Sequence, residues 1–472
     1  MNHVTTIDLI IVALYMLFML GIGLYFVKRV KNGGDFYVAG RSLGPVTLAA
    51  TVCATIIGGS AMMGRGGISY TSGMRSVAIA IPYLLGMFVF SGISGRIEEV
   101  GRTRGVSSIP ELIELRYGKK VKYLIAVLIG YTMMATVASQ VSATATIFRM
   151  IGGGIGITYE MGAIIATLIF IAYTAASGLF GVVYTDVVQF FMLLLFVYIL
   201  LPGMSISKIG GLSELIRNTP GEFFQMKMDG ELIGMIVTNL VFTMAGAEMW
   251  QRAFAAKSKK AATKGMFWGT SVYAVTILVT LGLGLAARQL YPGIVEEFGT
   301  ADAVIPTMVI RVLPIGITGL TLAGLLSVMM SSADSYLLIS TQTFVSDIWK
   351  TRKPDLSSKT ELLISRILTV VLALGAMVIA LYIKNAYDAL MFAWTFYAAS
   401  VGLPAVAALY WKKATKAGIV SSILTGFFVS ILWKILGQPF NLGAAVPGSI
   451  ACGIVLVVVS LCTYKKHPAP MA

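Results

Sequence analysis

The sequence has 472 residues, of which 57% are hydrophobic and only 12% are charged, whereas a soluble domain is about 25% charged. Apolar runs of about 20 residues recur from end to end, which indicates a polytopic, all-α membrane protein embedded in the lipid bilayer. The net charge of +15 does not indicate a nucleic-acid partner, because the basic residues cluster in short loops between the apolar runs.

Thirteen membrane spans are predicted within a single membrane domain, residues 1–472, and no segment between them is long enough to form a separate soluble domain. The first run, residues 7–27, follows no Lys or Arg and precedes no small-residue cleavage site, so we expect a spanning helix rather than a cleaved signal peptide. The predicted spans are residues 6–27, 45–72, 75–95, 121–148, 159–179, 183–203, 231–252, 265–287, 317–347, 361–383, 388–410, 417–434 and 446–464.

The distribution of basic residues predicts the orientation of these spans. With the N-terminus outside, the inner loops hold 26 of the 36 Lys and Arg residues, including Lys465 and Lys466 near the C-terminus. Inner loops of membrane proteins are enriched in Lys and Arg. We therefore expect a multi-pass protein of the cell (inner or plasma) membrane, with the N-terminus outside and the C-terminus in the cytoplasm.

The second span is unusual because glycine recurs inside it, at Gly58-Gly59, Gly64 and Gly66-Gly67. Glycine weakens a helix interior, and broken membrane helices line the binding sites of transporters. The span is therefore predicted to be interrupted; the alternative is that these glycines let another helix approach closely. Arg65 lies in the same span and either binds a substrate carboxylate, forms a gate, or extends to the membrane surface.

The segments that do not span the membrane are short. The inner loop of residues 96–120 contains Ser107-Ser108-Ile109-Pro110-Glu111, which has the cap and early proline of a helix start, so we expect a short amphipathic helix there. Residues 205–229 and 291–314 are the other predicted non-spanning segments.

A polar stretch, Ser327-Val328-Met329-Met330-Ser331-Ser332-Ala333-Asp334-Ser335, lies inside a long apolar run. On a helix, Val328, Ser331, Ser332 and Ser335 share one face, and Asp334 lies beside it. Oxygen atoms that converge without nitrogen or sulfur suit an alkali or alkaline-earth ion. The alternative is a polar face that hydrogen-bonds neighbouring helices.

Histidine catalysis or ligation in the membrane core is excluded, and the cysteines indicate neither a disulfide framework nor a metal motif. His3 and His467 lie at the two ends of the chain, and Cys53, Cys452 and Cys462 have no paired spacing that would indicate a disulfide framework or a metal motif. The sequence also lacks HExxH and Gly-x-Gly-Asp motifs. An intramembrane enzyme is therefore not expected.

Four stretches together resemble the sodium:solute symporter family, over about residues 36–413. They are Tyr37-Val38-Ala39-Gly40-Arg41-Ser42-Leu43-Gly44-Pro45, Tyr184-Thr185-Asp186-Val187-Val188-Gln189, Trp250-Gln251-Arg252, and Met330-Ser331-Ser332-Ala333-Asp334-Ser335 with the following Ser346-Asp347-Ile348-Trp349. The resemblance implies a leucine-transporter-type core of five spans repeated in inverted orientation, residues 45–410. Residues 6–27 form a peripheral first helix, and residues 411–472 form two peripheral helices and a short tail.

The resemblance also implies one sodium site and indicates a second. In the first, sodium is bound by the backbone carbonyls and side-chain hydroxyls of Ala54, Ile57, Val328, Ser331 and Ser332. The second uses Asp186, Ser331, Asp334 and Ser335, although Asp334 stands where many members have a hydroxyl residue. Two carboxylates there either strengthen ion binding or share a proton. The alternative for Asp186 is a structural cap at the start of its span.

The predicted function is symport of a small organic solute (a carboxylate, an amino acid or a vitamin-like compound) coupled to sodium, by alternating access. Near the broken helix, the candidate substrate residues are Ser60, Arg65, Gln140, Thr144, Trp394, Phe396 and Tyr397. For each of them, the alternative is a role in packing.

The chain resembles the pantothenate, proline and choline carriers. Ile56 replaces a tryptophan of the choline carriers and an aspartate of the proline carriers, whereas residues 305–310 resemble the pantothenate type. We expect an anion or zwitterion. Proton coupling, or a channel or sensor on the same fold, are the alternatives.

Overall fold

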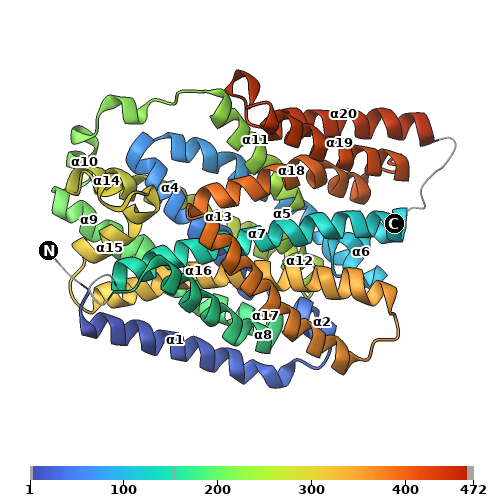
Figure 1. Ribbon diagram of the computed structural model, residues 1–472, viewed down its shortest axis with the longest axis horizontal. Coiled ribbons are helices and arrows are strands. Elements are labelled where there is room, and N and C mark those ends of the chain that lie inside the picture. The colour runs from blue at the N-terminus through green and yellow to red at the C-terminus, as the bar shows by residue number, and fades with distance from the viewer. Residues whose placement is uncertain (1–3, 153–155, 465–472) are drawn as a thin grey trace.

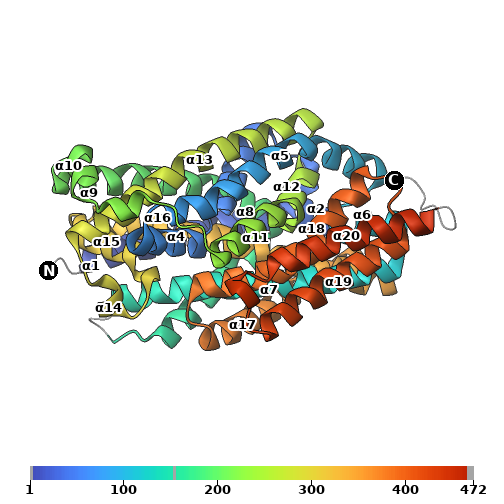
Figure 2. The same ribbon diagram turned by 90° about the horizontal axis from the view of Figure 1, so that it is seen from above.

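The structure is a computed structural model that describes residues 4–152 and 156–464. His3, Lys465, Lys466 and His467 lie outside the described residues. The described chain is almost entirely helical, and its long helices run side by side along the longest axis of the molecule (Figure 1; Figure 2). The first described helix begins, and the last described helix ends, at opposite ends of this bundle.

Most of the predicted spans are single long helices. Among the described residues, eleven helices are long and apolar enough to cross a membrane, and a bent pair makes a twelfth. Predicted span 159–179 corresponds to a shorter apolar helix, Tyr159–Ala172, which begins α8. The unbroken helices are α1 Thr6–Phe26, α5 Arg75–Arg104, α7 Lys119–Gly152, α13 Lys259–Leu290, α16 Ile317–Gln342, α17 Ser358–Tyr382, α18 Ala386–Tyr410, α19 Lys416–Ile435 and α20 Ala445–Tyr464.

The second span is broken, as predicted. Helix α3, Pro45–Ile57, and helix α4, Gly59–Ser72, meet at an angle of 52°. The junction is Gly58, whose φ of +40° is unfavourable for residues with a side chain. The break leaves the last carbonyls of α3 without intrahelical partners, inside the bundle.

Two further breaks occur at glycine. Helix α11, Gly230–Ala245, is separated from α12, Ala247–Ala255, by Gly246, whose ψ of 97° is not helical. Because α11–α12 is the sixth core helix and α3–α4 the first, the two breaks match the expected five-plus-five repeat. In α8, Tyr159–Met192, Gly178 has φ +56°, and a Cβ there would lie 2.6 Å from the ring of Phe36. This glycine kinks α8 near the end of the predicted span 159–179.

Helix α16 lies at the centre of the bundle, and all of its most apolar stretch is buried. It continues into a π-helical segment, Thr343–Lys350. Helix α8 also continues into a π-helical segment, Leu193–Leu200, which leads into α9, Leu201–Ile209. Helix α1 packs on α8 and α16, whereas α19 and α20 pack on each other and on α18. Figure 1 shows α1 and the α19–α20 pair on opposite sides of the bundle. Their outward faces carry large apolar side chains, which suits contact with lipid.

Short helices lie at the two ends of the bundle (Figure 1). At one end are α2, Gly33–Val38, and α6, Ile109–Tyr117. At the other end are α10, Leu212–Asn218, α14, Ile294–Phe298, and α15, Val304–Val312.

The predicted helix in the loop 96–120 is confirmed as α6, which Ser108 caps by accepting a hydrogen bond from the amide of Glu111. Arg116 of α6 donates to the carbonyls of Ala408, Trp411 and Lys412. A buried cation thus satisfies the carbonyls at the end of α18.

Candidate ion and substrate sites

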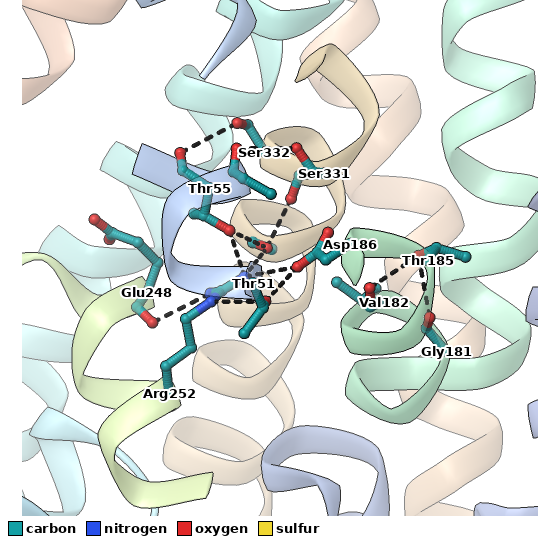
Figure 3. A network of polar contacts seen from close by, with 12 residues as sticks. Thr51, Thr55, Gly181, Val182, Thr185, Asp186, Glu248, Arg252, Ser331 and Ser332 are labelled. Atoms are coloured by element: carbon teal, nitrogen blue, oxygen red, sulfur yellow. Dashed lines mark hydrogen bonds and ion pairs between the residues drawn. The ribbon is translucent and has the colours of Figure 1, made fainter. Parts of the chain in front are cut away.

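The hydroxyl face of α16 meets the broken end of α3. Ser331 Oγ lies 3.1 Å from the carbonyls of both Ala54 and Val328. Ser332 Oγ lies 3.3 Å from the carbonyl of Thr55 (Figure 3). All of these residues are buried. Ile57, the remaining predicted ligand, is the last residue of α3. The structure therefore brings together oxygens that the sequence places 277 residues apart.

The chemistry of this cluster suits a monovalent cation. Its donors are neutral carbonyl and hydroxyl oxygens, and the negative end of the α3 dipole points at them. Within residues 4–152 and 156–464, no group of three or more His, Cys, Asp or Glu side chains is placed to hold a metal ion. Divalent ions generally require more negative charge than these oxygens supply.

A buried ion pair lies beside this cluster. The Asp186 carboxylate of α8 accepts a hydrogen bond from the Thr51 hydroxyl, and its Oδ2 is 3.3 Å from Nη2 of Arg252 (Figure 3). Both charged side chains have no exposed surface. Arg252 also donates to Ser335, which belongs to the predicted second sodium site, at 2.7 Å. Asp334, from the same predicted site, accepts from the Thr174 hydroxyl at 2.7 Å.

A small cavity of about 20 Å³, enough for roughly one water molecule, lies near the break between α3 and α4. Arg65 reaches it from α4 and Trp394 from α18. The other polar and aromatic residues that line it were not predicted, because one aromatic residue or amide on an apolar helix is indistinguishable in sequence from ordinary packing. These residues are Tyr83, Asn239, Tyr273 and Tyr387.

Arg65 has no acidic partner in this cavity. Its Nη1 donates to the Tyr273 hydroxyl and its Nε to the carbonyl of Ala61, and its guanidinium lies 5.1 Å from the centre of the Tyr273 ring. The residue is only 5% exposed. Among the described residues, it forms no ion pair with a carboxylate. Its side chain is therefore buried inside the protein, and its contacts in the described part of the chain are with neutral dipoles and an aromatic ring.

Of the other predicted substrate residues, Trp394 lines this cavity and the rest do not. Ser60 and Gln140 bind each other, since the Gln140 amide donates to Ser60 Oγ at 2.8 Å. Thr144 donates to the carbonyl of Gln140, and Tyr397 donates to the carbonyl of Ala245 beside the second helix break. Trp394 stacks on Phe242, with ring centres 3.8 Å apart, whereas Phe396 packs against Phe392 and Phe427. The structure thus places Arg65 and Trp394 on the cavity, and the remaining residues around it or away from it.

Glu248 was also not predicted from sequence. It lies in the first turn of α12, has no exposed surface, and neither carboxylate oxygen has a hydrogen-bond partner in the described part of the chain. Its backbone carbonyl accepts from Arg252 at 3.3 Å. A signal was present in the sequence, because Glu248 and Arg252 are charged residues inside an apolar span.

The predicted family is confirmed by comparison with known proteins. The family model of the sodium:solute symporter family matches residues 36–426. The chain is 29% identical to the sodium/pantothenate symporter of Haemophilus influenzae, over 94% of both chains. It is 27% identical to the high-affinity proline transporter of Bacillus subtilis, over 96% of this chain and 97% of that protein.

The fold is also found in solved structures. A Na+-coupled sialic acid symporter, solved in a substrate-bound outward-open state, superposes with a TM-score of 0.85 at 19% identity, over 99% of this chain and 100% of the other. A nucleobase-cation-symport-1 family transporter superposes with a TM-score of 0.62 at 14% identity, over 92% of this chain and 95% of the other. The predicted leucine-transporter-type fold is thereby confirmed. The chain belongs to the sodium:solute symporter family, and its coupling ion is sodium.

Proposed function

We propose that this protein uses a sodium gradient to transport a small organic solute that carries a carboxylate group. The observation that carries the proposal is the buried guanidinium of Arg65, which lines a cavity beside a broken helix and has no acidic partner among the described residues. A buried charge is costly unless it is paired. A substrate carboxylate would supply the missing charge and fits the forked donors of arginine.

The relatives support this substrate class. Pantothenate, proline and sialic acid, the solutes named for three of the similar proteins, all carry a carboxylate. In this chain the rings of Tyr83 and Trp394 form apolar walls of the cavity, and Asn239 contributes a polar side chain. Ser60, Gln140, Thr144 and Tyr397 lie outside this lining, and we propose that they contact the solute only when the cavity enlarges.

The broken helix provides a route for coupling. Ala54, near the end of α3, contributes a carbonyl to the sodium cluster, and Arg65, on α4, lines the cavity. Sodium bound between α3 and α16 would hold the broken helix against the central helix, and the solute would hold α4 from the other side of Gly58. Each ligand therefore favours the same arrangement of one helix pair, which is the thermodynamic condition for coupling.

A ligand screen on the purified protein tests the substrate class. We expect small monocarboxylates to raise the unfolding temperature in sodium chloride, and to raise it less in potassium chloride, because a ligand stabilises the state that it binds. The amide analogue of each active carboxylate serves as the control and should lose the effect. Stabilisation by neutral amides equal to that by the acids would contradict the proposed role of Arg65.

We also propose the orientation with the N-terminus outside, because of the charge distribution in the loops. Lys413 and Asn441 provide a matched test, since both are exposed and they flank α19 at its opposite ends. In a Cys462→Ser background, which removes the one exposed cysteine of the described chain, a membrane-impermeant maleimide should label Asn441→Cys in intact cells. It should label Lys413→Cys only after the cells are opened. The reverse pattern would place the N-terminus inside.

A further inference from the structure

Arg252 lies among the oxygens that a second sodium ion would need. Its Nη2 donates to Thr55 Oγ1 at 2.5 Å and to Ser335 Oγ at 2.7 Å, and lies 3.3 Å from Asp186 Oδ2. Its Nε donates to Thr51 Oγ1 at 3.1 Å. The guanidinium, which has no exposed surface, therefore contacts one carboxylate, three hydroxyl oxygens and the backbone carbonyl of Glu248.

The position of Arg252 in the fold makes this coordination unusual. The residue is on α12, the half-helix that follows the break at Gly246, whereas its side-chain partners are on α3, α8 and α16. Figure 3 shows the side chain extending from α12 toward Thr51 and Asp186. One side chain thus links the second broken helix to the first broken helix and to the helix that carries the sodium hydroxyls.

We propose that the Arg252 guanidinium is a tethered cation that takes the place of a second sodium ion, so that this protein binds one sodium per molecule. This assignment presupposes the sodium-coupled function proposed above. A sodium ion at Asp186 would lie within about 4 Å of the guanidinium, and repulsion at that distance weakens binding by roughly 1,000-fold at an effective dielectric constant of about 20.

The proposal predicts what happens when the charge of Arg252 is removed. Asp186 Oδ1 has no hydrogen-bond partner in the described part of the chain, so it is available as soon as the competing cation is lost. In Arg252→Gln, Asp186 and Ser335 lose their cationic partner and become free to bind an ion. We therefore expect this substitution to create a second sodium site.

Equilibrium binding of radioactive sodium to the purified full-length protein measures this directly. We expect one bound sodium per wild-type molecule and two in Arg252→Gln, and one again in the double variant Arg252→Gln/Asp186→Asn. Asp186→Asn alone should keep one sodium, with an affinity within about threefold of wild type. Arg116→Gln is the control, because it removes another buried guanidinium that donates to backbone carbonyls far from Asp186.

Several results would overturn the proposal. Two sodium ions per wild-type molecule would show that Arg252 does not exclude the second ion, and a single sodium in a folded Arg252→Gln protein would show that it is not a competitor. If Arg252→Gln does not fold, loss of sodium binding in Asp186→Asn still contradicts the proposal, and retention supports it. No sodium binding by the wild type would instead contradict the sodium-coupled function itself.

Discussion

Replacing Ser331 by alanine is expected to lower the apparent sodium affinity of transport by about 10- to 100-fold. The substitution removes one oxygen from a small shell of neutral ligands, and hydrogen-bond-like contacts to a charge contribute about 1.5–3 kcal/mol each. Ser332→Ala should have an effect in the same direction. Both are measured as the sodium concentration that gives half-maximal uptake at saturating solute.

Ser340→Ala is the matched control for these variants. Ser340 is another buried serine on α16, but its hydroxyl has no hydrogen-bond partner among the described residues. Its removal should leave the sodium dependence unchanged, at similar protein yield. If Ser331→Ala and Ser332→Ala both retain the sodium dependence of the wild type, the sodium site is not where α3 meets α16.

Arg65→Gln is expected to raise the KM for the solute by about 100-fold, while the sodium affinity changes little. The variant loses a charge-assisted interaction with the substrate carboxylate that contributes about 3 kcal/mol. Arg65→Lys keeps the charge but not the forked geometry, so its KM should rise less than that of Arg65→Gln yet remain well above wild type. Initial rates of uptake over a range of solute concentrations measure both effects.

Arg311→Gln is the matched control, because it tests whether the loss of any partly buried arginine raises the KM. Arg311 is half-buried at one end of the bundle, pairs with Glu297 at 2.5 Å, and does not line the cavity. Its replacement should leave the KM unchanged. A wild-type KM in both Arg65 variants would leave Arg65 as a structural residue held by Tyr273, and the carboxylate specificity would have to come from elsewhere.

The local features of this protein could be predicted from its sequence. Apolar runs define the helices, and the glycines around Gly58 predict a broken span because they weaken a helix whatever surrounds it. The polar face formed by Ser331 and Ser332 follows from helical spacing alone. The contact of this face with Ala54 came from the family resemblance, and the structure shows the same pairing.

Features that depend on tertiary contacts were not predictable in the same way. The partner of Asp186 is Arg252, 66 residues away on a different core helix, and nothing in the local sequence of either residue specifies the pair. Tyr273 and Tyr387 converge on Arg65 from α13 and α18. A single tyrosine on an apolar helix gives no signal of this role, because its ring would be accommodated equally well by packing. The break at Gly246 lacked the run of glycines that marked Gly58.

The most direct test of the account is solute uptake into proteoliposomes that contain only this protein. The solute is the carboxylate that stabilises the purified protein most strongly in sodium. An inward sodium gradient should drive its accumulation above the external concentration, and replacing sodium by potassium, with an inward proton gradient imposed, should abolish this accumulation. Full accumulation under the potassium and proton condition would contradict sodium coupling.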